Sequence, residues 1–142
     1  NYASHSIAAD EIVRIIRAEG GTAITVQADV GNEAQVMAMY EKVDSQLGRL
    51  TALVNNAGVV DVQARVDQMS VARLERMLRI NVIGSFVCAR EAVRRMSTRH
   101  GGAGGVIVNL SSAAARLGEG DSQDALSAPN GRLAVHAKVP HD

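Results

Sequence analysis

The stretch LTALVNNAG at residues 50–58 decides the fold class of this sequence. Its apolar first half, residues 50–54, is a short run of the kind found in strands that are buried on both faces. The Asn-Asn-Ala-Gly turn at residues 55–58 follows directly. Ligands of open parallel sheets bind beyond the carboxyl ends of the strands, and a turn of small residues there lets a ligand approach the backbone. A polar turn that only closes the strand is an equally good interpretation of this segment taken alone.

Helix and strand patterns alternate upstream of this stretch. Apolar residues recur at helical spacing over residues 7–19, and the β-branched segment at residues 22–28 is typical of a strand. Asn32, followed by Gln35, has the spacing of a capping box and predicts the start of a second helix. Gly48 is expected to end that helix.

The same alternation continues downstream. Ser70 is a suitable N-cap for a long helix over residues 70–99. Several arginines lie in its last turns up to Arg99, where positive charge interacts favourably with the helix dipole. The segment VIVNL at residues 106–110 predicts another buried strand. Strands that alternate with helices in this way indicate an α/β fold with a doubly wound parallel sheet.

The last part of the sequence differs from the rest. Residues 119–142 show no sustained helical or strand period, and both prolines, Pro129 and Pro140, lie there. We expect residues 1–118 to form the folded domain. We expect the tail to be disordered or to come from a frameshift.

Composition excludes several classes of function. Fifteen Lys and Arg balance fifteen Asp and Glu among the 142 residues, and only three residues are aromatic, so neither a basic nucleic-acid surface nor a base-stacking platform is expected. No apolar run approaches the roughly 20 residues needed to span a bilayer. A single cysteine fits a reducing compartment. These features predict a soluble, cytoplasmic protein.

Polar residues recur where strands end. Asp29 and Val30 follow the strand at residues 22–28, and Ser111 and Ser112 follow the strand at residues 106–110. Each pair could contact a ligand or could serve as a helix cap or turn.

Asn81 is a separate signal because it lies inside the predicted long helix, where Asn is unfavourable. A buried amide must find hydrogen-bond partners, either at an active site or between two helices. The sequence alone leaves both roles open.

Other features predict no site. The glycines at residues 101–105 precede a strand, whereas a phosphate-binding loop follows one and opens a helix. Cys88 lies in an apolar helical segment and is expected in the core. No metal site is expected, because the four histidines are not spaced with other ligand residues in the way that metal ligands are: His5, His100, His136 and His141.

The combination of these motifs resembles the short-chain dehydrogenase/reductase family. The resemblance rests on Asp29-Val30, the Asn-Asn-Ala-Gly turn, Asn81 within RINVIGSF and the strand end VIVNLSS. Their order and their 27-position gap from Asp29 to Asn56 match the family over residues 1–118. The resemblance implies a Rossmann-like sheet.

The resemblance also implies roles for particular residues. It assigns the cofactor contacts to Asp29, Val30, Asn55, Asn56, Ala57 and Gly58. Asp29 and Val30 would contact the adenine, and the Asn-Asn-Ala-Gly turn would line the ribose side.

Two catalytic positions follow from the same match. Asn81 would hold a proton-relay water, and Ser112 would steady the substrate oxygen. Ser112 is preferred over Ser111 because Gly118 then follows six residues later, as in family members. The implied chemistry is hydride transfer between a nicotinamide and an alcohol or ketone, with a Tyr as acid/base.

The sequence departs from the family pattern in two ways. The family's glycine-rich pyrophosphate loop and first strand would precede Asn1, so the Rossmann-like domain is expected to be truncated. The family's Tyr-x-x-x-Lys is absent: no Tyr follows Tyr40, Ala125 lies in the neighbourhood where the Tyr is expected, and Ala134 lies four residues before Lys138. We therefore expect the isolated chain to be inactive.

A truncated sheet has a structural consequence. In the strand order 3-2-1-4-5, the first strand lies between the second and the fourth. We therefore expect a gap or a changed pairing in the middle of the sheet.

The cofactor is expected to be NADP or NAD, with NADP favoured because residues 1–4 lack the acidic residue that binds a ribose 2′-hydroxyl. Family members often pair through the helix equivalent to residues 70–99, so a homo-oligomer is expected. The alternative is a non-catalytic interaction protein that keeps the family's long helices. A receiver domain fits less well, since no acidic cluster marks a phosphorylation site.

Overall fold

A computed structural model describes residues 1–62, 64–111 and 137–139. Its sheet has the order β1-β2-β3. Strand β1 (Ala52–Asn55) pairs in parallel with β2 (Gly105–Asn109), with Ala52 opposite Val106 and Asn55 opposite Asn109. This parallel pair confirms the predicted α/β class, and the carboxyl ends of the two strands meet at one edge.

The third strand was not anticipated from the sequence. Strand β3 (Ala137–Val139) pairs antiparallel with β2 within the C-terminal segment in which no strand period is visible. Three residues are too few to show an alternating pattern, so the pairing depends on the neighbouring strand rather than on a local signal.

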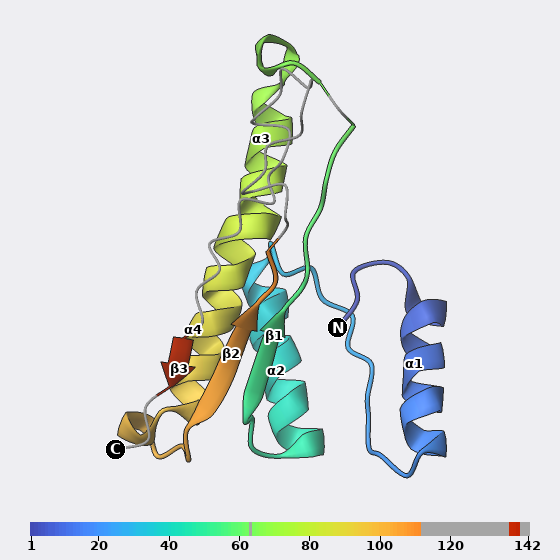
Figure 1. Ribbon diagram of the computed structural model, residues 1–142, viewed down its shortest axis with the longest axis vertical. Helices are drawn as coiled ribbons and strands as arrows, with labels where there is room; N and C mark the ends of the chain where they lie inside the picture. The colour runs from blue at the N-terminus through green and yellow to red at the C-terminus, as the bar shows by residue number, and fades with distance from the viewer. Residues whose placement is uncertain (63, 112–136, 140–142) are drawn as a thin grey trace.

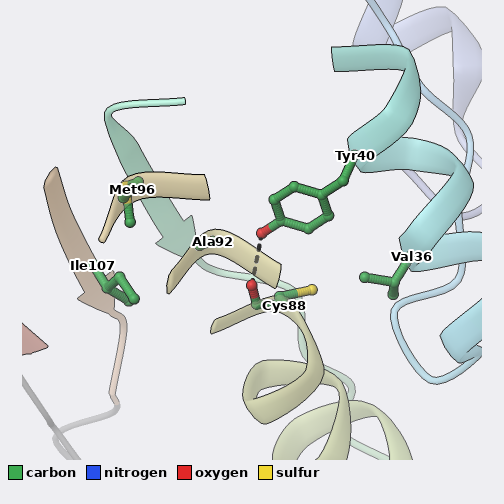
Figure 2. Packing of buried hydrophobic residues seen from close by; sticks show 6 residues of the cluster. All are labelled: Val36, Tyr40, Cys88, Ala92, Met96 and Ile107. Carbon is green, nitrogen blue, oxygen red and sulfur yellow. Dashed lines mark hydrogen bonds between the residues drawn. The ribbon is translucent and has the colours of Figure 1, made fainter. Parts of the chain in front are cut away.

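Helices α2 (Glu33–Leu47) and α4 (Ser85–Met96) build the core with the sheet. Figure 2 shows the buried cluster, which consists of Val36, Tyr40, Cys88, Ala92, Met96 and Ile107. The Tyr40 hydroxyl donates a hydrogen bond of 2.8 Å to the backbone oxygen of Cys88. The prediction that Cys88 is a core residue is confirmed.

Charged side chains form a network on α4 that also contacts α2. Arg95 lies 4.8 Å from the centre of the Tyr40 ring, and its Nε is 2.7 Å from an Asp44 carboxylate oxygen. The buried Glu91 carboxylate pairs with Arg90, Arg94 and Arg95. Burial raises the pKa of Glu91, but hydrogen bonds from the arginines outweigh it and leave the pKa below its usual value.

Among the described residues, helices pack on one face of the sheet. Ile107 points into the core, whereas Val54 is 58% exposed and Val106 is also exposed. The prediction that the strand at residues 50–54 is buried on both faces is therefore wrong. Its continuous apolar pattern could not show which face the described helices cover.

The predicted long helix is interrupted by a different helical form. It consists of α3 (Val71–Leu78), a π-helical turn η2 (Arg79–Gly84) and α4, and the 3-10 turn η3 (Thr98–His100) follows. Figure 1 shows α3 and α4 as one nearly straight rod. A short 3-10 turn, η1 (Val66–Gln68), precedes it.

Local capping signals are realised as predicted. Asn32 accepts a hydrogen bond from the backbone nitrogen of Gln35 at the start of α2, and Ser70 accepts one from that of Arg73 at the start of α3. Gly48 ends α2 with a φ of 79°, a conformation that favours glycine.

The N-terminal segment stands apart from the sheet. Helix α1 (Ser6–Ala18) forms where predicted but buries none of its residues, and Figure 1 shows it beyond the strand layer. The predicted strand at residues 22–28 forms only an isolated parallel bridge, Tyr2 with Gln27, which lies outside the three-stranded sheet. The expected gap in the sheet therefore lies between the segment at residues 22–28 and β1. An open pocket of about 430 Å³ is lined by the bridge segment and by α2.

The buried thiol of Cys88 should make the free energy of unfolding depend on pH in the alkaline range. Burial raises the pKa of Cys88 from 9.0 to about 11 and also raises the pKa of Tyr40. The unfolded chain therefore loses these protons first, and the free energy of unfolding should fall as the pH rises from about 9 to about 11. Urea unfolding at about pH 8 and about pH 10.5 measures this fall. Cys88→Ala should reduce this fall in the free energy of unfolding. An equal fall in both proteins would contradict the raised pKa of Cys88.

Candidate functional site

The buried amide of Asn81 joins the π-helical turn to the loop beyond β1. Its Oδ1 accepts a hydrogen bond of 2.8 Å from the backbone nitrogen of Val59, and its Nδ2 donates one of 2.9 Å to the backbone oxygen of Val59. The Asn81 residue is only 4% exposed. Both of its polar ends are thus satisfied by one peptide segment, and π-helical turns of this kind occur frequently at functional sites.

Gly84 brings a second strand end to the same turn. A Cβ atom at Gly84 would lie 2.8 Å from the backbone oxygen of Val30, closer than packed atoms allow. A Cβ at Gly31 would lie 3.2 Å from side-chain atoms of Arg79 and Ile80. The segment after residues 22–28 therefore packs directly on η2, because glycine is present at the contact.

A second amide connects the two sheet strands to this turn. Asn55 donates through Nδ2 to Oδ1 of Asn109 at 2.9 Å and to the backbone oxygen of Ser85 at 3.2 Å. The Ser85 hydroxyl in turn donates to the backbone oxygen of Asn81 at 3.2 Å. A continuous set of hydrogen bonds thus runs from the end of β2, through β1, to η2 and its loop.

Asn109 and Ser85 were missed by the sequence analysis. The parallel register places Asn109 directly beside Asn55. The sequence shows that both strands end in Asn, but it does not show which residues pair. Ser85 lacked a signal because its role depends on the π-helical turn.

The predicted cofactor residues divide into two groups. Asn55 is buried and its side chain faces other protein groups, whereas Asn56, Ala57 and Gly58 are exposed just beyond the strand end. Asp29 is exposed, and its Oδ1 accepts a hydrogen bond of 2.8 Å from the backbone nitrogen of Gly31. Its remaining lone pairs can accept from a ligand amino group.

The two predicted serines have different outcomes. Ser111 is exposed immediately beyond β2, where the preceding Leu110 nitrogen bonds to the Asn55 backbone oxygen at 3.1 Å. Ser112 lies outside the described residues. Its catalytic role remains a prediction from the sequence.

Other kinds of site find no support among the described residues. In that part of the chain, no group of three or more His, Cys, Asp or Glu side chains is arranged to hold a metal ion. None of its helices combines the length and apolar character required to cross a bilayer. The polar edge formed by residues 29–31, 55–59 and 81–85 is the candidate site, and its donors and acceptors suit a dinucleotide.

Comparisons with known proteins identify the relatives of this chain. The sequence profile described as short chain dehydrogenase matches residues 2–123. The uncharacterized oxidoreductase YgfF of Escherichia coli is 47% identical over 118 residues, which cover 83% of this chain and 48% of that protein. Glucose 1-dehydrogenase 2 of Bacillus subtilis is 35% identical over 112 residues, which cover 79% of this chain and 43% of that protein.

Solved structures give the same result. A short chain dehydrogenase from Burkholderia cenocepacia, in complex with NADP, superposes with a TM-score of 0.79 at 27% identity. The match covers 92% of this chain and 51% of that one. The chain thus spans about half the length of the relatives it matches. The predicted Rossmann-like fold is confirmed.

The Asn81 contact predicts a stability loss on substitution. Asn81→Ala leaves the Val59 nitrogen and oxygen without their partners and should lower the free energy of unfolding by about 2 kcal/mol. Urea denaturation monitored by circular dichroism measures the change. Glu75→Ala, an exposed substitution on α3, is the control and should change stability by less than about 0.5 kcal/mol. Equal effects of the two substitutions would contradict the structural role of Asn81.

Proposed function

Because the chain belongs to the short-chain dehydrogenase family, we propose that it contributes to the site of an NAD(P)-dependent oxidoreductase. The reaction is reversible hydride transfer between a nicotinamide and an alcohol or ketone. One observation carries this proposal: Asn81 holds the loop beyond β1 while Gly84, on the same turn, contacts the strand end at Val30. Two ligand-facing segments thereby meet at the edge where parallel sheets bind dinucleotides.

We assign the adenine end of the cofactor to Asp29 and Val30. The exposed Asp29 carboxylate keeps acceptor capacity beyond its bond to Gly31, and this supports an interaction with the adenine amino group. Asn56, together with the rest of the exposed turn at residues 56–58, lines the ribose side. Asn55 holds the start of this turn through its hydrogen bonds to Ser85 and Asn109.

We assign the proton-handling side to Asn81 and Ser112. A nicotinamide cofactor supplies or accepts the hydride when it is bound. Both ends of the Asn81 side chain bond to Val59, so the relay water is assigned to the Asn81 backbone oxygen. That oxygen accepts from the Ser85 hydroxyl, and in this proposal it also accepts from the water. Ser112 hydrogen-bonds the substrate oxygen in this proposal.

The 142-residue chain by itself is proposed to be inactive in turnover. Its last tyrosine is Tyr40, so it offers no Tyr-x-x-x-Lys acid/base pair after the serine. NADP is favoured over NAD because residues 1–4 contain no acidic residue. The presence of NADP in the related Burkholderia cenocepacia structure supports this preference.

The cofactor assignment is tested with the protein translated from the complete reading frame that contains these residues. Its titration into NADPH should change the cofactor fluorescence, and Asp29→Asn should weaken binding roughly tenfold because a charge-assisted hydrogen bond is lost. The amide still accepts from Gly31, so the local turn is kept.

Glu41→Gln removes an exposed carboxylate elsewhere and should leave the affinity unchanged. The 142-residue chain, assayed in parallel with NADPH and ketones, should show no oxidation. An unchanged fluorescence signal, in a protein whose reading frame also lacks Tyr-x-x-x-Lys, would contradict the proposal and favour a non-catalytic protein.

A second candidate function, self-association, is favoured by one surface. The apolar ridge is an exposed set of side chains at four-residue spacing along α3, η2 and α4: Leu74, Leu78, Val82 and Phe86. Phe86 is 70% exposed. Exposed apolar patches of this kind mark interaction sites. We propose that two copies pair through this ridge, either as the enzyme's oligomer or as the whole function of a non-catalytic protein.

The pairing proposal predicts a change of mass. Sedimentation should find a dimer or larger assembly, and Phe86→Glu should convert it to a monomer because a charge is placed in the contact. Met37→Glu, an equivalent change at an exposed position on α2, should leave the mass unchanged. A monomer at all concentrations for the unsubstituted protein would rule out the interface.

A further inference from the structure

The loop that follows the Asn-Asn-Ala-Gly turn is held at two points. We call residues 59–62 the fixed loop. At its start, Val59 is bonded twice to Asn81. At its end, Nη2 of Arg73 on α3 donates a hydrogen bond to the backbone oxygen of Val62. The loop is therefore tied to the helical rod at two places, about two turns of helix apart.

An ion pair reinforces the second contact. The Arg73 Nε lies 3.9 Å from Oδ2 of Asp61, and the more exposed Arg76 lies 3.5 Å from the same oxygen. The other oxygen of Asp61 accepts a hydrogen bond of 2.8 Å from the Val62 nitrogen. Asp61 thus shapes the loop backbone and binds the helix at the same time.

Arg73 is the least exposed member of this ion pair. Its side chain is 14% exposed, and its Nε is buried without a hydrogen bond within the described residues. Buried polar groups are normally satisfied. A shift of the Asp61 carboxylate by about 1 Å would bring it to hydrogen-bond distance of this donor. The second contact can therefore tighten further.

The fixed loop presents apolar side chains to solvent. Val60 is 63% exposed and Val62 is 80% exposed, although the backbone of Val59 and the backbone oxygen of Val62 are held by Asn81 and Arg73. The loop begins directly after Gly58, at the carboxyl edge of the sheet, where ligands bind. A rigid backbone that exposes two valines beside such an edge is suited to contact with an apolar part of a ligand.

We propose that Arg73 and Asp61 are positioning residues, which hold Val60 and Val62 as an apolar wall for the non-reacting carbon chain of the substrate. This inference rests on the proposed oxidoreductase function. It assigns preference among ketones to the fixed loop. Arg73 and Asp61 act through the loop and do not contact the reacting atoms.

The first test measures the loop without activity. Hydrogen–deuterium exchange of the 142-residue chain should show exchange in residues 59–62 that is about tenfold faster in Arg73→Met, because one hydrogen bond and one ion pair are lost. Peptides from β2 should be unchanged. Arg14→Met, which breaks an exposed arginine–glutamate pair on α1, is the matched control and should leave the loop unchanged. Equal exchange in Arg73→Met and the unsubstituted chain would overturn the positioning role.

The second test measures preference among substrates with the protein from the complete reading frame. NADPH oxidation is followed with 2-butanone, 2-hexanone and 2-octanone. Arg73→Met, and separately Val60→Ser with Val62→Ser, should raise KM for 2-octanone several-fold more than for 2-butanone, since the longer chain buries more apolar surface against the wall. The value of kcat should change by less than about twofold. The double serine variant should show this effect with the loop exchange unaltered.

The outcomes separate the two proposals. Equal changes of KM for all three ketones would overturn the wall while leaving the oxidoreductase proposal intact. No NADPH oxidation by the unsubstituted protein with any ketone would overturn the oxidoreductase proposal and the wall together, and the exchange result would still decide the positioning role. A loss of dimer mass in the double serine variant would assign the valines to a contact between copies and overturn the wall.

Discussion

The requirement that a buried amide be hydrogen-bonded governs the arrangement of this protein's polar edge. Asn81 lies buried inside a helix, and among the described residues its side chain bonds to Val59, in a loop 22 positions earlier. The helix has a π-helical turn at this position. In the same region the Asn81 backbone oxygen accepts from Ser85, and Gly84 contacts Val30. One unfavourable residue in the helix therefore fixes the relative positions of two strand ends and a loop.

Local signals predicted the helices well because their physical causes are local. Asn32, Gly48 and Ser70 act through bonds or backbone conformations within a few residues, and the structure confirms each of them. The segment at residues 22–28 has strong strand preference, yet it forms only one bridge, because a strand requires neighbours that a single segment cannot specify.

The candidate site could be predicted only in part for the same reason. Asn81 and the strand-end turn were visible in the sequence because their residue types are unusual in those positions. Asn109 and Ser85 became recognisable only when the register and the π-helical turn were known. The inward-facing role of Asn55 also depended on tertiary contacts, since its neighbour Asn56 has the same chemistry and is exposed.

The π-helical turn also links the polar edge to the apolar core through simple counting. Relative to an α-helix, such a turn contains one additional residue, and each residue advances the helix by about 100°. Removing one residue from Arg79–Gly84 would rotate the buried side chains of α4, among them Cys88 and Met96, away from the sheet. The turn is thus equivalent to a one-residue insertion, and the direction in which the downstream hydrophobic residues face depends on it.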